Sequence, residues 1–308
     1  MATINAKDVA ELRKQTGCGM MDCKNALVAA NGDFEEAIKV LREKGMAATA
    51  KKASRIAADG LVDILTEGNV TAMVEVNSET DFVAKNETFR AFVRDVLGAI
   101  IANRPADVTA LLACKTSSGK TVEEEVQEKT FTMGEKLSVR RFVVVEGLVS
   151  TYIHGLGATG VIISFEADDA AKNNAGFAEF AKNIALQAAA YVTPYVNRSD
   201  VPESVIASER EILTAQMAQD PKMAGKPQKV LDGIITGRLG KFYEANCLME
   251  QAYVKDDSLT VAKYVEQTAK AFGGSIKVTG CIRFDKGEGI EKREDDLAAE
   301  VAKMVGGN

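Results

Sequence analysis

The feature that most constrains this chain is an internal repeat. DGLV at residues 59–62 recurs as EGLV at 146–149, and FRAFVRDV at 89–96 recurs as FAEFAKNI at 177–184. The two offsets are 87 and 88 residues, so one inserted residue aligns both blocks. Since a sequence repeat marks a repeated supersecondary unit, the pattern predicts a core in which strand, strand and helix occur twice.

The hydrophobic periods give the elements of the repeat and of the segments after it. GLVDIL, a TEGN turn and VTAMVEVN predict a β-hairpin, and an apolar face over residues 87–101 predicts the helix that follows. Residues 203–219 and 228–243 predict an antiparallel helical hairpin of coiled-coil type, projecting from the second copy. A strand is expected at 274–284, and a closing amphipathic helix at 294–304.

A separate helical unit precedes the repeat. Helices are predicted over residues 8–14 and 20–30, and a third after Asp33, which would form a capping box with Glu36 and end at Gly45. Residues 1–55 carry 10 basic and 7 acidic side chains, a charge of +3, whereas the remaining residues carry −9. This asymmetry predicts a separate docking module.

Together these patterns predict an α+β fold in four parts. The parts are a three-helix module at 1–55, a first core copy at 56–140, a second core copy at 141–283 with the hairpin at about 200–243, and a C-terminal helical module at 284–308. Both core copies are expected to hold small antiparallel sheets with helices.

Composition argues against several kinds of chemistry. His154 is the only histidine, which leaves no second imidazole for a two-His metal site. The five cysteines form no C-x-x-C pair, and their odd number argues against a disulfide framework or zinc cluster.

The net charge of −6 argues against non-specific binding of nucleic acid or membrane. No run approaches the roughly 20 apolar residues of a spanning helix, and the first residues lack a secretory or Arg/Ser-rich targeting pattern. We therefore expect a cytoplasmic protein with no metal site.

Two segments resemble nucleotide-binding motifs in their letters only. GLGATG at 155–160 fits G-x-G-x-x-G, but the β-branched residues after it predict a strand where the dinucleotide motif needs a helix. CKTSSGKT at 114–121 has Cys114 where a phosphate-binding loop needs glycine. We interpret both segments as turns.

The two copies differ at one informative place. Thr80-Asp81-Phe82 in the first aligns with Asp168-Asp169-Ala170 in the second. A shared fold does not require an aromatic side chain that only one copy carries. The difference therefore predicts that Phe82 is a surface residue with a functional role. The alternative is that Phe82 is an aromatic residue of the core.

Three motifs carry a resemblance to a known family. LRKQTGCGMMDCKNALVAANGDFEEAIKVLREKG at 12–45, EVNSETDFVAKN at 75–86 and RFDKGEGIEKREDDLAAEV at 283–301 resemble, in order and spacing, the signatures of bacterial elongation factor Ts. The resemblance covers essentially the whole chain and implies an N-terminal module similar to ubiquitin-associated domains. The chain departs from the family at LGAT (156–159), where a basic residue is frequent, and within CLMEQAYV (247–254), where Pro and Phe are usual.

The resemblance implies a guanine-nucleotide exchange factor that is not itself a GTPase or other enzyme. It would bind elongation factor Tu, a translational GTPase, and accelerate GDP release without a cofactor and without binding nucleotide or nucleic acid. The N-terminal module and the first core copy would engage the nucleotide-binding domain of Tu, and the second copy another domain. A non-exchanging binding adaptor of the translation machinery is the alternative, and an enzyme built on CKTSSGKT a remote third. The helical hairpin would join two copies, in a homodimer or a 2:2 assembly, or contact the partner.

The resemblance also assigns residues to three surfaces. Phe82 would insert near the phosphate/magnesium site of Tu. The exchange residues are Thr80, Asp81, Phe82, Val83 and Lys85; the N-terminal docking residues are Arg13, Met20, Met21 and Lys24; the second copy contributes His154 and Gly155.

Overall fold

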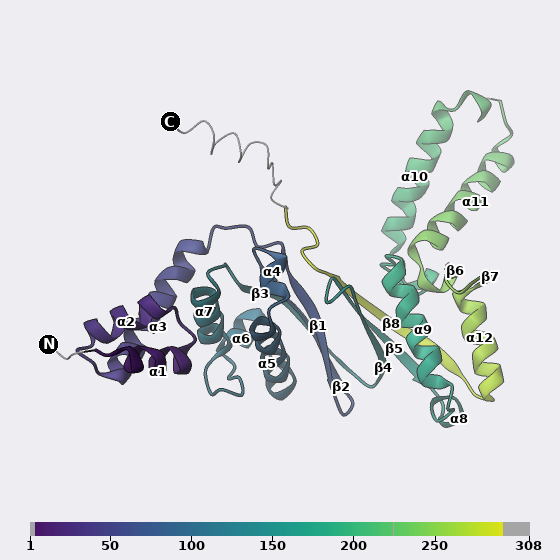
Figure 1. Cartoon of the computed structure of the whole chain (residues 1–308). Coiled ribbons are helices and arrows are strands. Elements are labelled where there is room, and N and C mark those ends of the chain that lie inside the picture. The colour runs from purple at the N-terminus through teal and green to yellow at the C-terminus, as the bar shows by residue number, and fades with distance from the viewer. Residues whose placement is uncertain (1–3, 224, 292–308) are drawn as a thin grey trace.

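The computed structural model describes residues 4–223 and 225–291 as an elongated molecule (Figure 1). Three N-terminal helices lie at one end, two sheets occupy the middle, and a helical hairpin projects near the other end. The closing helix predicted at 294–304 lies outside the described residues. No helix in the described ranges is long and apolar enough to span a membrane.

The N-terminal helices form a small core of their own. They are α1 (Ala6–Thr16), α2 (Met20–Ala29) and α3 (Phe34–Lys52). An Asn5–Asp8 capping box begins α1, and Gly17, in the left-handed conformation with φ 68°, ends it. Leu12, Leu27 and Leu41, one from each helix, pack together in the middle, so the three-helix prediction is confirmed.

Gly45 does not end the third helix, so that prediction was wrong. α3 continues through it to Lys52, and Gly45 is buried where α3 meets α7 (Val122–Met133). A Cβ at this position would lie 3.6 Å from the carbonyl oxygen of Gln127 and 3.7 Å from Cβ of Phe131. The glycine therefore allows two helices to approach closely.

The predicted capping box at the start of α3 is only half formed. Asp33 accepts a hydrogen bond from the amide of Glu36 at 2.9 Å. The Glu36 carboxylate is paired with Lys39, one turn further on, at 3.0 Å. The N-cap at Asp33 is confirmed, and the return bond from Glu36 is not formed.

The predicted repeat is confirmed and extends further than its letters suggested. The first copy holds β1 (Asp59–Glu67), β2 (Val70–Ser78), α4 (Asp81–Ala84) and α5 (Glu87–Asn103), and the second holds β4 (Leu148–His154), β5 (Thr159–Ala167), α8 (Asp169–Lys172) and α9 (Phe177–Ala190). In each copy a later strand, β3 (Ser138–Glu146) or β8 (Ile276–Asp285), pairs antiparallel with the second strand. The sheet orders are β1-β2-β3 and β4-β5-β8. Strand β3 crosses the boundary expected between residues 140 and 141.

Further helices and strands surround this frame. They are α6 (Val108–Ala113), α10 (Glu203–Gln219), α11 (Gln228–Asn246), α12 (Val261–Phe272), β6 (Ala252–Tyr253), β7 (Asp256–Thr260) and short 3-10 turns at Arg198–Asp200, Pro221–Met223 and Leu248–Glu250. The antiparallel helical hairpin is confirmed as α10 and α11. Helix α12 and strands β6 and β7 were not anticipated from the sequence.

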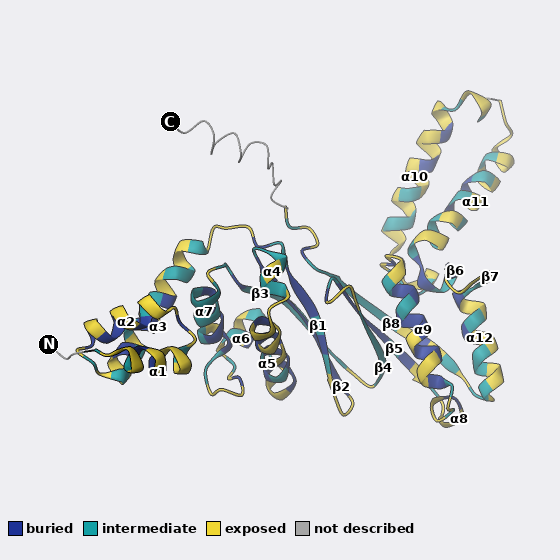
Figure 2. Ribbon diagram, in the orientation of Figure 1, coloured by how far each residue is buried: buried dark blue, intermediate teal, exposed yellow. Residues whose placement is uncertain are grey.

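The two sheets face each other, and helices cover their outer faces (Figure 1). Val62, Met73 and Ile162 are buried between the sheets, together with side chains from all six strands. On the far side of the first sheet, Phe89 and Phe92 of α5 fill a second core. A third core packs α9 and α12 against the second sheet. Buried residues accordingly follow the strands and the inner sides of α5 and α9 (Figure 2).

The glycines of GLGATG serve this packing of sheet on sheet. Residues 155–158 turn between β4 and β5, as interpreted from the sequence, and the amide of Val62 donates to the carbonyl of Gly157 at 2.8 Å. Gly157 has φ 98°, and a Cβ there would lie 2.9 Å from the carbonyl oxygen of Val62. A Cβ at Gly160 would lie 2.6 Å from Cγ1 of the same valine. Side chains at these positions would push the sheets apart.

Replacing Gly157 with alanine is expected to destabilise the protein by about 3 kcal/mol, measured as the free energy of unfolding in urea. The left-handed conformation contributes roughly 1–2 kcal/mol, and the backbone clash adds about 1–3 kcal/mol. Gly119→Ala is the matched control, because Gly119 has φ 82° and no atom within 4 Å of the place where a Cβ would lie, and so isolates the conformational part. Equal losses in the two variants would contradict the role of Gly157 in sheet packing.

Candidate functional site

Phe82 stands on α4, a single helical turn that follows β2. The residue is 80% exposed, the largest value among the exposed large hydrophobic residues of the described ranges. The aligned position in the second copy, Ala170 on α8, also faces solvent. The surface position predicted for Phe82 is confirmed, and only one of the two equivalent turns presents an aromatic ring.

Two of the predicted exchange residues face inward and hold α4 in place. Thr80 donates its backbone N–H and its hydroxyl to the carboxylate of Glu135, at 2.9 and 2.6 Å. The hydroxyl of Ser78 donates to the carbonyl of Thr80 at 2.8 Å. Val83 packs against the core of the first copy. Phe82 therefore projects from an anchored base.

A charged pair flanks the exposed ring. Lys85 donates to Asp81 at 2.6 Å, one turn apart along the chain. This hydrogen bond lowers the pKa of the Asp81 carboxyl below its usual value. The ammonium of Lys85 also lies 6.0 Å from the centroid of the Phe82 ring. At neutral pH the exposed turn thus presents an apolar ring beside an ion pair.

The predicted N-terminal docking residues lie on the surface of the helical module. Met20 and Met21 begin α2 and are 49% and 62% exposed, and Arg13 and Lys24 are exposed too. Val28 is also exposed, and it lies seven residues after Met21, on the same side of α2. The sequence reasoning missed Val28, although its spacing from Met21 was a usable signal.

In the second copy, His154 ends β4 and Gly155 begins the tight turn described above. The hydroxyl of Tyr152 lies 3.3 Å from Nδ1 of His154. Leu156 is 70% exposed and has φ 57°, an uncommon conformation for a branched residue. The sequence reasoning missed this exposed apolar side chain. The turn could present both the imidazole and Leu156 to a partner.

The structure does not bring these three groups together into one pocket. They are carried by α1 and α2, by α4 and its flanking residues, and by the β4–β5 turn, which follow one another along the length of the molecule (Figure 1). Within the described ranges, no three His, Cys, Asp or Glu side chains are grouped to hold a metal ion. The arrangement suits contact with a large partner over several regions.

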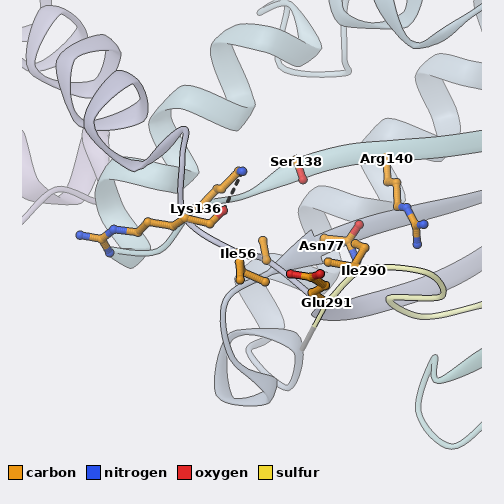
Figure 3. A pocket seen from close by; sticks show the side chains of 9 residues that line it. Ile56, Asn77, Lys136, Ser138, Arg140, Ile290 and Glu291 are labelled. Atoms are coloured by element: carbon orange, nitrogen blue, oxygen red, sulfur yellow. Dashed lines mark hydrogen bonds between the residues drawn. The ribbon is translucent and has the colours of Figure 1, made fainter. Parts of the chain in front are cut away.

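A pocket of about 370 Å³ lies where the chain between α3 and β1 meets β2, β3 and the segment after β8 (Figure 3). Its lining residues are Arg55, Ile56, Ala57, Asn77, Lys136, Ser138, Arg140, Ile290 and Glu291. Asn77 is buried, and its Nδ2 donates to the carbonyl of Asp59 and to Glu75, each at 3.0 Å. Its Oδ1 has no hydrogen-bond partner among the described residues. None of the residues predicted for the site lines this pocket.

A buried carboxylate ties the end of the second copy to the first sheet. The side chain of Glu75 is fully buried and pairs with Arg140 at 2.9 Å and with Arg141 at 2.6 Å. The amide of Gly287, just after β8, donates to it at 2.8 Å. Burial alone would raise the pKa of Glu75, but the hydrogen bonds from Gly287, Asn77 and the two arginines outweigh it and lower the pKa.

Comparison with known proteins decides which family this arrangement belongs to. The family described as Elongation factor TS matches residues 79–288. The elongation factor Ts of Syntrophotalea carbinolica is 44% identical over 306 residues, covering 98% of this chain and 99% of that relative. The chain belongs to the elongation factor Ts family. The elongation factor Ts of Clostridioides difficile is 45% identical over 309 residues, covering 99% of this chain and all of that relative.

The matched range has structural meaning for an elongation factor Ts. It begins at Glu79, at the base of α4, and ends at Glu288, which pairs with Arg141 at 3.0 Å. The range therefore contains the whole second sheet, strand β3 of the first sheet, the exposed Phe82 and the segment that docks on Glu75. The three-helix module lies before it, within the part of the chain that the two relatives also cover.

Glu75→Gln is expected to lower the free energy of unfolding at pH 7 by about 3–5 kcal/mol, because it leaves two arginines without their buried partner. Since folding lowers the pKa of Glu75, its stabilisation is present above the unfolded value of about 4.3. It is lost as pH falls from there through the folded pKa. The advantage of the unmodified protein over Glu75→Gln should therefore shrink below about pH 4.3.

Urea unfolding measured from pH 7 down to pH 3 checks this dependence. Glu36→Gln is the control, because Glu36 forms an exposed pair with Lys39, and such pairs contribute little. A Glu75→Gln protein as stable as the unmodified one at pH 7 would contradict the role of this cluster.

Proposed function

We propose that this chain promotes the exchange of GDP for GTP on elongation factor Tu by placing Phe82 beside the phosphate/magnesium site of that GTPase. Membership of the elongation factor Ts family supports the general exchange role. The observation that carries the finer proposal is the Phe82 ring, 80% exposed on a turn whose base is anchored to Glu135. An exposed ring on a fixed base can enter a partner with little loss of its own freedom.

In this proposal the factor is neither a GTPase nor another enzyme, because it breaks no bond. Its role is to bind Tu more tightly when GDP has left. By linkage, a factor that weakens GDP binding is itself bound more weakly by the GDP form, to the same degree. The proposal therefore needs no cofactor on this chain and no nucleotide site of its own.

Magnitudes show that Phe82 cannot act alone. Shifting a two-state population from 1:99 to 99:1 takes roughly 5.5 kcal/mol of differential binding. Burying one Phe side chain contributes about 1.5–3 kcal/mol. The remainder has to come from other contacts, so we assign docking on the nucleotide-binding domain of Tu to Arg13, Met20, Met21 and Lys24. A second contact, on another domain of Tu, is assigned to His154 and Gly155.

The helical hairpin offers one more surface. Leu213, Met217, Ile235 and Leu239 are buried between α10 and α11, whereas Ile212 and Val230 are 48% and 45% exposed. We propose that this apolar surface joins two copies, in a homodimer or a 2:2 assembly, or lies against Tu. Sedimentation of the factor with and without Tu distinguishes these arrangements.

Phe82→Ala is expected to slow GDP release from Tu at saturating factor by at least tenfold, because about 1.5–3 kcal/mol of apolar burial is lost at the displaced site. The affinity of the factor for nucleotide-free Tu should change less. Stopped-flow release of fluorescent GDP measures the rate. Val254→Ala, which truncates another exposed apolar side chain, is the control. With this variant, GDP release from Tu should be as fast as with the unmodified factor.

An unchanged release rate with Phe82→Ala would remove Phe82 from the mechanism. Binding of the unmodified chain to Tu without any accelerated release would instead favour the adaptor alternative.

A further inference from the structure

The turn between α7 and β3 is fastened to the base of α4 in both directions. Glu135 in this turn accepts hydrogen bonds from the amide and the hydroxyl of Thr80. In return, Glu79 accepts a hydrogen bond from the amide of Lys136 at 2.6 Å. Residues 79–80 and 135–136 thus form a reciprocal clamp in which each side supplies a carboxylate and a backbone N–H.

The hydroxyl of Thr80 bonds to the clamp and not to its own helix. Thr80 is the N-cap residue of α4, a position where a Thr hydroxyl usually accepts from an amide in the first helical turn. Here no side-chain cap is formed, and the hydroxyl donates to Glu135, 55 residues away. The placement of α4 therefore depends on a distant carboxylate.

The second copy makes the same link with its groups exchanged. Asp168, aligned with Thr80, caps α8 at the amide of Ala171 and accepts from Ser275 through its amide and its hydroxyl, at 2.7 and 3.0 Å. Ser275 directly precedes β8, as Glu135 lies shortly before β3. In that copy the carboxylate caps its own helix, and Ala170 stands where Phe82 stands in the first copy. Only in the copy with the exposed ring does the residue at this aligned position bond to a carboxylate from the segment before the third strand.

The clamp also includes the chain that leaves the N-terminal module. The ammonium of Lys136 donates to the carbonyls of Ala53 and Arg55, at 2.7 and 2.8 Å. The guanidinium of Arg55 pairs with Glu79 at 3.2 Å. The end of α3, the base of α4 and the start of β3 are therefore joined through a continuous set of polar contacts.

From this geometry we infer that Glu135 is a positioning residue for exchange, which acts through Thr80 to fix the direction in which Phe82 leaves the surface. The inference rests on the proposed function. It predicts that loss of Glu135 leaves docking on Tu intact and impairs the step that Phe82 performs, since a small misplacement of a reacting group has a large effect on rate.

The test is a double-mutant cycle on GDP release from Tu. Glu135→Ala is expected to slow release at saturating factor by about tenfold, with little change in the factor concentration that gives half the maximal rate. In a Phe82→Ala background the same change should not slow GDP release further, because the ring that Glu135 positions is absent. Glu135→Gln should restore part of the rate, since its amide oxygen can still accept from Thr80. Thr80→Val, which removes only the hydroxyl bond, provides a milder variant with an expected loss of about threefold.

Ser275→Ala is the matched control. It removes the hydroxyl bond of the equivalent link behind Ala170, and it should leave the release rate unchanged. Thermal unfolding of every variant verifies that the first sheet stays folded.

Two results would overturn the inference while the proposed function stands. One is an unchanged rate of GDP release with both Glu135→Ala and Thr80→Val, while Phe82→Ala slows that release. The other is an equal loss from Glu135→Ala with and without Phe82. If Tu releases GDP as fast with Phe82→Ala as with the unmodified factor, the proposed function fails, and the inference fails with it.

Discussion

The carboxylate of Glu75, withdrawn from water inside the first sheet, constrains much of this structure. A buried carboxylate without partners would be very unfavourable, so Arg140, Arg141 and the amide of Gly287 have to be in place for the protein to fold. These partners come from β3 and from the segment after β8. One charge therefore ties the third strand of the first sheet to the end of the second copy, on the strand that leads into the base of α4.

Duplication gave the chain two copies of one frame, and their differences lie at the ends of equivalent strands. Both frames close the gap between their second and third strands with a carboxylate, a hydroxyl and an amide. The first copy places the carboxylate on the later segment and carries Phe82, while the second places it on the helix cap and carries alanine. The shared fold accommodates either arrangement, and only one of the two equivalent turns carries an aromatic ring.

Much of the fold could be predicted because its signals are local or periodic. The repeat, the hairpins of strands and helices, and the exposed position of Phe82 all follow from spacing and from comparison of the copies. The predicted end of the third helix at Gly45 was wrong, because a glycine that ends a helix and a glycine that lets a neighbouring helix approach look alike in sequence. Only the close contact with α7 distinguishes the two cases. Glu135 was missed because its partner lies 55 residues away, and no period connects the two. The assignment of partner and activity depended on family signatures, which no property of a single residue could replace.

The unbroken course of α3 through Gly45 has a mechanical consequence. Its 19 residues form a rod about 28 Å long that starts in the three-helix module and ends one residue before Ala53. Over that length, a tilt of about 2° at one end displaces the other by roughly 1 Å. The far end is held by Lys136 beside the support of Phe82, so one continuous helix links the three-helix module to that support. A helix broken at Gly45 would act as a loose tether, whereas this one would convert a slight change in how the module is seated into movement at the ring.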